Sequence, residues 1–330
     1  MGELLKIRGL TVRLSAARGE FDAVSDLDLD LDQGEILAIV GESGSGKSLT
    51  ALAIMRLLPD PPAFIAKGSI IFAGVDLATA DEERVARIRG DRIGMVFQEP
   101  MTSLNPSIRV GPQVAEVLDL HRGLTGKAAR AAVEGLFARV RISDPERRFD
   151  DYPHQMSGGM RQRAMIAMAI ACEPDLVIAD EPTTALDVTT QAQILDIFRD
   201  LGREGRALML ITHDLGVVAE TADRVAVMYA GRIVETAPVT ALFDAPQHPY
   251  TRGLLASIDA PIAASDGARG RLTEIPGAVP ALWALSSGCA FAPRCTRAQT
   301  LCSDRRPVLD EVAPGHRAAC WFPSRRDGRA

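Results

Sequence analysis

This sequence has few aromatic side chains and no excess of basic over acidic residues. Phe, Trp and Tyr make up 5% of the 330 residues, and 37 Lys and Arg stand against 43 Asp and Glu, for a formal net charge of −6. A chain without a basic excess lacks the electrostatic signature of nucleic-acid binding. We therefore expect no nucleic-acid partner.

Long apolar segments are missing as well. No stretch reaches the roughly 18 uninterrupted apolar residues that spanning a bilayer requires, and the N-terminal MGELLKIRGLTVRLS has no basic segment followed by an apolar run. We expect a cytoplasmic protein that meets a membrane only through partner proteins. Because 47% of the residues are apolar, an α/β domain with an appendage is the expected class.

A glycine-rich segment follows a continuous apolar run, residues 36–40, and precedes a segment with helical periodicity. Its eight residues, GESGSGKS at 41–48, match the phosphate-binding pattern G-x-x-x-x-G-K-S, in which backbone N–H groups surround phosphate oxygens. Lys47 would reach the β- and γ-phosphates and the Ser48 hydroxyl would bind Mg²⁺. The predicted nucleotide-binding set here is Gly41, Ser43, Gly44, Ser45, Gly46, Lys47, Ser48 and Leu49.

A second apolar run, in DLVIADEP, predicts a buried parallel strand that ends at two carboxylates. Adjacent side chains leaving a strand point to opposite sides, so Asp180 and Glu181 receive different roles. We assign Asp180 to Mg²⁺ and Glu181 to the general base that polarises the attacking water.

The segment YPHQMSGGMRQR places Ser157, Gly158 and Gly159 at the head of a helix, where a hydroxyl and free backbone N–H groups form a second anion site. This segment resembles the LSGGQ signature of ATP-binding cassette (ABC) ATPases. The resemblance implies that two subunits pack head to tail, so that the signature of one covers the γ-phosphate held by the other.

Three further motifs resemble ABC elements in the same order along the chain. VFQEP places Gln98 at the Q-loop position, which contacts Mg²⁺ and the attacking water; TALD places Asp187 in the D-loop; LMLITHD ends a strand at His213, the switch histidine. The resemblance implies an α/β P-loop fold with a mainly parallel sheet, an antiparallel β subdomain and a helical subdomain at about residues 100–170. ATP binding would close the dimer and hydrolysis would release it, with Gln98 and the segment to about residue 106 relaying the motion to a membrane-protein helix.

One position departs from the ABC pattern. The aromatic residue that usually stacks on adenine falls at Leu14, and Phe21 is the only aromatic residue nearby. A leucine offers no π-face, so we expect weak discrimination between ATP and GTP.

The sequences of several segments, among them QEPMTSLNP and HPYTRGLLAS, closely resemble those of the ATP-binding subunits of bacterial dipeptide/oligopeptide importers. That resemblance implies peptide uptake by a peripheral subunit at the cytoplasmic face of the plasma membrane. Its implied partners are a second ABC ATPase subunit (or a second copy of this chain), two transmembrane permeases and an extracytoplasmic substrate-binding protein. Other cargo, such as a nickel chelate or glutathione, and a non-transport ABC ATPase remain as alternatives.

We divide the chain into an ABC domain, residues 1–235, and a Pro-rich extension, residues 236–330. The extension carries Cys289, Cys295, Cys302 and Cys320, spaced C-x5-C-x6-C-x17-C, whereas Cys172 lies in the ATPase core. Four thiols in a cytosolic, loop-rich segment favour a metal site over disulfides. The wide spacings favour iron–sulfur, with zinc and free thiols left open; the family resemblance implies a 4Fe-4S cluster.

Overall fold

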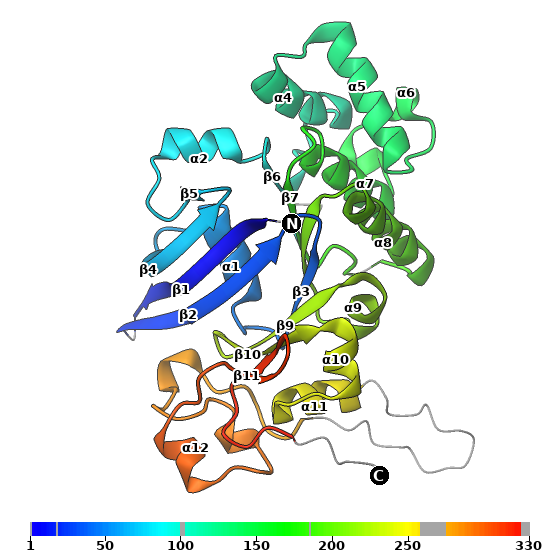
Figure 1. Ribbon diagram of the computed structural model, residues 1–330. Helices are drawn as coiled ribbons and strands as arrows, with labels where there is room; N and C mark the ends of the chain where they lie inside the picture. The colour runs from blue at the N-terminus through cyan, green and yellow to red at the C-terminus, as the bar shows by residue number, and fades with distance from the viewer. Residues whose placement is uncertain (1, 18, 100–102, 185, 258–274, 325–330) are drawn as a thin grey trace, which may run out of the picture.

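The computed structural model describes residues 2–17, 19–99, 103–184, 186–257 and 275–324, and two sheets organise them (Figure 1). One is antiparallel, in the order β2 (Gly19–Asp32), β1 (Glu3–Ala16), β4 (Ala63–Phe72) and β5 (Val75–Asp76). The other has the order β11 (Asp310–Ala313), β12 (His316–Ala318), β10 (Arg232–Pro238), β9 (Arg224–Tyr229), β3 (Ile36–Val40), β8 (Ala207–Ile211), β7 (Leu176–Asp180) and β6 (Ile93–Val96).

The second sheet is parallel from β9 to β6, and these strands are mostly apolar because both faces are covered. Alternate residues of β3 enter two different cores. Leu37 and Ile39 pack with β1, β2 and α1 (Lys47–Ile54), whereas Ala38 and Val40 pack on the side of the larger helices. The strands predicted from the apolar runs at 36–40 and 176–179 are confirmed.

The helices divide between the core and a separate group. Figure 1 shows α4, α5 and α6 furthest from β1 and β2, with α7 between this group and the sheet. The helical bounds beyond α1 are α2 (Glu82–Ile88), α4 (Val110–Arg122), α5 (Gly126–Arg139), α6 (Pro145–Arg148), α7 (Gly158–Ala169), α8 (Val188–Arg203), α9 (Leu215–Thr221), α10 (Val239–Asp244), α11 (Pro249–Ala256) and α12 (Thr300–Asp304), with 3-10 turns at Pro153–Gln155, Leu282–Ala284 and Ala292–Arg294. The predicted combination of mixed sheet, antiparallel sheet and helical group is therefore present.

The C-terminal segment joins the central sheet. Strand β12 pairs with β10 through Glu235↔Ala318 and Thr236↔Arg317, and β11 pairs with β12. The buried Glu235 carboxylate accepts from the backbone N–H of Gln247 and His248 and lies 2.7 Å from His316 Nε2. The division predicted between residues 235 and 236 thus lies inside β10. That division stays a prediction, but residues 310–318 extend the sheet of the ABC domain.

A membrane-spanning helix was not expected. Among the helices of the described ranges, none combines the length and the apolar character that crossing a bilayer would need.

Candidate nucleotide-binding site

The predicted phosphate-binding loop connects the end of β3 to the start of α1. Gly41 passes so close to β9 that a Cβ atom there would lie 2.2 Å from the carbonyl oxygen of Met228, so a larger residue would not fit. Lys47 is buried, and its Nζ donates to the carbonyl oxygens of Gly41 (2.8 Å) and Glu42 (3.1 Å). Burial lowers the pKa of Lys47, and three nearby carboxylates oppose that shift. Incoming phosphate oxygens would replace two carbonyl partners of this ammonium group.

The loop also contains polar groups without partners. The Ser45 Oγ is buried and makes no hydrogen bond within the described residues, although buried hydroxyls normally have a partner. Gly46 caps α1 without a side-chain acceptor, so no capping side chain of the described residues meets the first N–H groups of that helix. Ser43 and Gly44 are exposed, and Leu49 is half-buried. These unmet donors fit an anionic ligand such as the phosphates of a nucleotide.

Two of the three residues assigned to Mg²⁺, Ser48 and Asp180, lie together, whereas the third, Gln98, bonds to Glu181. Ser48 on α1 donates its hydroxyl to Oδ1 of Asp180, at the end of β7, over 3.1 Å. Burial raises the pKa of Asp180, opposed by the Ser48 hydrogen bond and the charge of Lys47. A hydroxyl and a carboxylate offer the oxygen ligands that Mg²⁺ prefers, so this pair fits the ion.

Glu181 is the centre of a second polar group. Its Oε2 accepts from Gln98 Nε2 at 3.3 Å and from Thr184 Oγ1 at 2.9 Å, and it lies 3.4 Å from His213 Nδ1. The backbone of Glu181 has a positive φ of 47° and its N–H donates to Ile211 of β8. Sequence reasoning predicted three of these four side chains. It missed Thr184, whose only signal is its place three residues after Glu181.

The signature segment packs against Thr190, which is bonded to the D-loop residue Asp187 of the same chain. Ser157 caps α7 by accepting from the Met160 N–H, and a Cβ atom on Gly159 would lie 2.6 Å from Thr190 Cγ2. Asp187 in turn caps α8 and accepts from both the N–H and the hydroxyl of Thr190. These bonds lower the pKa of the Asp187 carboxyl. The starts of α7 and α8 therefore form one packed corner.

The two surfaces predicted to bind phosphate lie apart in the bonding of the described residues. No hydrogen bond or ion pair in the described part of the chain joins residues 157–159 or Asp187 to the loop at 41–48. One nucleotide held by Lys47 has no described contact with the signature of its own chain. Residues 100–102, in the segment predicted to relay motion after Gln98, lie outside the described residues.

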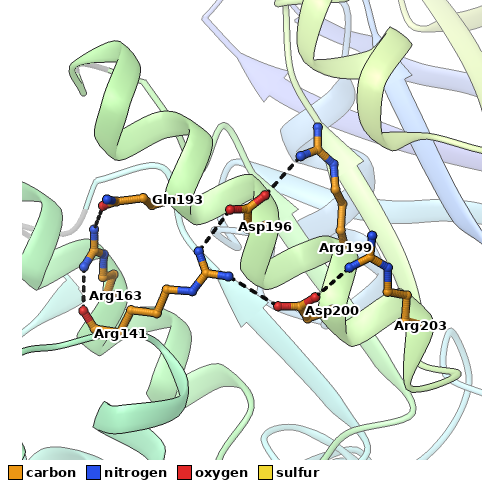
Figure 2. A network of polar contacts seen from close by, with 7 residues as sticks. All are labelled: Arg141, Arg163, Gln193, Asp196, Arg199, Asp200 and Arg203. Carbon is orange, nitrogen blue, oxygen red and sulfur yellow. Dashed lines mark hydrogen bonds and ion pairs between the residues drawn. The ribbon is translucent and has the colours of Figure 1, made fainter.

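A charged network fixes the helical group to α8 (Figure 2). Arg141, just after α5, pairs with Asp196 at 3.0 Å and with Asp200 at 3.5 Å. Arg163 of α7 donates to the Arg141 carbonyl oxygen and to Gln193 of α8. The same carboxylates are shared with Arg199 and Arg203. Because the ion pairs are about half exposed, they add little stability. Helix α7 is connected to α8 through the hydrogen bond from Arg163 to Gln193.

Two aromatic side chains lie together at the position expected to hold the adenine base. Leu14 and Phe21 are paired across β1 and β2, and Trp283 meets the Phe21 ring edge-on with centroids 5.7 Å apart. Trp283 comes from the C-terminal segment and is 57% exposed. A tryptophan from 262 residues further along the chain was not foreseen, because a lone Trp in a Pro-rich segment carries no local signal.

The four C-terminal cysteines line one small cavity of about 20 Å³. Burial raises the pKa of the Cys289 thiol and raises that of Cys320 to about 11, and the other three cysteines add to the shift at Cys320. Backbone N–H groups of Phe291 and Ala292 oppose the shift at Cys289. Four thiols with N–H donors suit a thiolate-bound metal group in chemistry.

The arrangement of these four cysteines in space is less suited to a metal group than their chemistry. In the described ranges no group of three or more His, Cys, Asp or Glu is arranged to hold a metal ion, and so large a group as a cubane would need the thiols to move apart. His316, four residues before Cys320, has its Nε2 bonded to Glu235. Neither the 4Fe-4S cluster nor zinc is supported by this arrangement, and the cluster stays a prediction.

A lysine-bearing phosphate loop, a strand-end Asp–Glu pair and a distant Ser-Gly-Gly helix start occur together in ATPases of the ATP-binding cassette class, and this chain is such an ATPase. The chain belongs to the ABC transporter family. The family described as "ABC transporter" matches residues 24–184, and the family described as "Oligopeptide/dipeptide transporter, C-terminal region" matches residues 234–302.

Similar proteins cover nearly the whole chain. A Sinorhizobium fredii protein named "Probable peptide ABC transporter ATP-binding protein y4tR" is 53% identical over 319 residues, which are 96% of this chain and 94% of the relative. The oligopeptide transport ATP-binding protein OppD of Bacillus subtilis is 49% identical and covers 97% of this chain and 88% of its own length. The dimeric post-hydrolysis structure of the cassette MJ0796 with ADP and Pi has a TM-score of 0.65 at 27% identity, over 72% of this chain and 99% of that one.

Proposed function

We propose that this chain is the ATP-hydrolysing subunit of an importer that carries di- or oligopeptides across the cytoplasmic membrane. The observation that carries the proposal is the combination, in one chain, of a nucleotide site and the C-terminal region of oligopeptide/dipeptide transporters. The relatives named for peptide and oligopeptide transport support the choice of cargo. The chain would lie at the cytoplasmic face as a peripheral subunit.

The active unit would be a head-to-tail dimer. Each chain offers a phosphate loop and, separately, a signature without a described bond to that loop. Two chains would therefore form two composite sites, each with Lys47 from one subunit and Ser157 from the other. The dimeric state of MJ0796 supports this arrangement. In the importers that this chain resembles, the partner is usually a second, different ABC ATPase subunit, and a second copy of this chain is the other candidate.

The chemistry would be attack of water on the γ-phosphorus of ATP, with ADP as the leaving group. Glu181 would take the proton of that water, and Gln98 and His213 would orient the water and the γ-phosphate from either side of the same carboxylate. Lys47 would hold the β- and γ-phosphates after leaving its two carbonyl partners. Mg²⁺ at Ser48 and Asp180 would neutralise the phosphate charge. Loss of the bridging γ-phosphate would let the dimer open.

The permease would dock beside the helical group. A groove of about 510 Å³ lies between the ends of α1, β6 and α7, lined by Met55, Leu57, Met95, Phe97, Met165 and Met168 among others. Leu57 and Phe97 are exposed despite their size, and methionines adapt to a partner surface. Phe97 precedes Gln98 directly. A permease helix seated here would touch the segment that senses the γ-phosphate.

The function is tested by affinity purification of the tagged chain from gently solubilised native membranes. We expect two multi-spanning permeases and a second ABC ATPase to co-purify, and the associated binding protein then identifies peptide, nickel-chelate or glutathione cargo. Leu57→Glu should lose the permeases, whereas the matched exposed change Leu120→Glu on α4 should keep them. Recovery of only soluble or nucleic-acid-associated partners would favour a non-transport ABC ATPase.

We further propose that Cys289, Cys295, Cys302 and Cys320 hold a 4Fe-4S cluster, with a structural role in a segment that has a small core. The gathering of four thiols in one place and the N–H donors at Cys289 support this, although the thiols would have to move apart to admit the cluster. Protein purified without oxygen should contain iron and sulfide and absorb broadly near about 400 nm. Zinc in place of iron would favour the alternative, and neither metal would leave free thiols.

A further inference from the structure

The C-terminal segment is bonded directly to the phosphate loop through Arg294. This arginine, immediately before Cys295, donates from Nη1 to Glu42 Oε2 at 2.7 Å and from Nη2 to Glu42 Oε1 at 3.0 Å. Glu42 is the second residue of the loop at 41–48. Two parallel bonds between a guanidinium and a carboxylate form the strongest and most directional of ion pairs in proteins.

The surroundings of Arg294 hold it in one position. Its side chain is only 5% exposed, and its remaining donors meet the carbonyl oxygens of Ile275 and Pro276 and the Tyr229 hydroxyl. The bonds to Glu42 raise the pKa of Arg294. Because these bonds hold the guanidinium in place, the position of the segment that carries Arg294 fixes the position of the Glu42 carboxylate.

A second residue of the C-terminal part of the chain, Tyr250, also holds Glu42. Its backbone N–H donates to the hydroxyl of Tyr250 at 2.8 Å. Tyr250 is fully buried on α11 and packs against Tyr229 and Phe291, the latter two residues after Cys289. The Glu42 carbonyl oxygen accepts from Lys47. Side chain, N–H and carbonyl of one loop residue thus link the cysteine-bearing segment to the lysine that binds phosphate.

We propose that Arg294 is a positioning residue for the nucleotide site, and that the C-terminal segment uses its ion pair with Glu42 to set the affinity of the phosphate loop. The inference rests on the nucleotide site proposed above. When Arg294 is removed, Glu42 keeps a partly buried carboxylate without its counter-ion, close to where the phosphates bind. The loop then loses its fixed shape and gains an unpaired negative charge facing its ligand.

Affinity for nucleotide is the direct readout. The full chain is titrated with a fluorescent ATP analogue, and Arg294→Gln should raise the dissociation constant about tenfold, within the usual range of coupling between sites. Arg294→Lys keeps the charge without the planar fork and should recover only part of the loss. At saturating ATP, kcat should change much less than KM. Arg252→Gln serves as the matched control, because the Arg252 side chain also belongs to the C-terminal part of the chain but bonds to Ser324 and, among the described residues, not to the phosphate loop.

The pair is isolated by a double-mutant cycle. Glu42→Gln alone also breaks the ion pair, from the loop side, and so tests the proposal even if Arg294→Gln fails to fold. Glu42→Gln combined with Arg294→Gln should bind ATP no more weakly than the weaker single variant. Strict additivity of the two effects would overturn the proposal.

Linkage requires the reverse effect as well. If the segment sets ATP affinity, ATP must stabilise the segment by the same coupling. Amide hydrogen exchange of residues 288–298 should slow when ATP binds to the wild type and not when it binds to Arg294→Gln. A wild type that binds no nucleotide would contradict the proposed site itself, whereas a binding wild type with an unaffected Arg294→Gln would contradict only the role of Arg294.

Discussion

Glu181 is the residue on which the assignment of chemistry depends. Its carboxylate has Gln98, Thr184 and His213 around one oxygen, and the residue keeps a positive φ although it is not glycine. Backbone conformations of this kind cost free energy and concentrate at functional sites. The backbone N–H bond to Ile211 of β8 holds the residue in this position.

Glu181→Gln should bind ATP, accumulate as a closed dimer and hydrolyse about 100-fold to 10,000-fold more slowly, the usual contribution of a general base. The amide keeps the shape and an acceptor for Thr184 but cannot take a proton. Turnover is measured by phosphate release and the dimer by gel filtration with ATP. Turnover at the wild-type rate would remove Glu181 from its assigned role.

The nucleotide site should discriminate only weakly between ATP and GTP. Leu14 offers no π-face to a base, and the nearby Phe21 ring is already in contact with Trp283. We expect the Michaelis constants for ATP and GTP to agree within about tenfold, which corresponds to roughly 1.4 kcal/mol. A stronger preference for ATP would mean that one of these rings stacks on adenine, and Trp283→Ala against Phe21→Ala would show which.

Between elements, the start of α7 packs closely against α8. A methyl group on Gly159 would lie 2.6 Å from Thr190 Cγ2, and Thr190 is held by two bonds to Asp187, whereas Gly158 has nothing within 4 Å in the single chain. The two adjacent glycines of the signature therefore face different neighbours.

Gly159→Ala should disturb the corner between α7 and α8 in the single chain and lower the melting temperature, and Thr190→Ser should restore it by removing Cγ2. Gly158→Ala should leave melting and ATP binding by the single chain unchanged, yet prevent ATP-dependent dimer closure by crowding the partner's phosphate. Thermal melting and gel filtration separate the two. Equal melting temperatures for both alanine variants would contradict the packing argument.

Elements with a local signal were predictable from the sequence. Strands β3 and β7 are short apolar runs, and the caps Ser157 and Asp187 stand directly before their helices. Contacts between distant segments were not predictable: Arg294 lies 252 residues from Glu42 and carries no pattern of its own. For the same reason the pairing of β12 with β10 was missed, because three residues, HRA, are too few to indicate a strand.

Across the whole molecule, the phosphate loop and the signature are each complete but are not joined within the described chain. The network of Figure 2 fixes α7 to α8, and the Arg294–Glu42 pair fixes the C-terminal segment to the loop. Each surface is therefore held rigidly by its own neighbours. The position of one chain relative to the other is then what can change, and ATP hydrolysis would change it.

Sharing of sites between chains is tested by complementation, provided that the wild-type chain alone hydrolyses ATP. Lys47→Ala removes the phosphate lysine. Ser157→Asp keeps an acceptor for the Met160 N–H but places a negative charge against the partner's phosphate. Each variant alone should be inactive.

In an equal mixture half of the dimers are mixed, and each mixed dimer contains one site with both Lys47 and Ser157 intact. If the two sites act independently, the mixture should therefore recover about a quarter of the wild-type ATPase rate. Because a site complete within one chain would be damaged in both variants, no mixture could repair it. Absence of recovery beside an active wild type would thus contradict the head-to-tail arrangement.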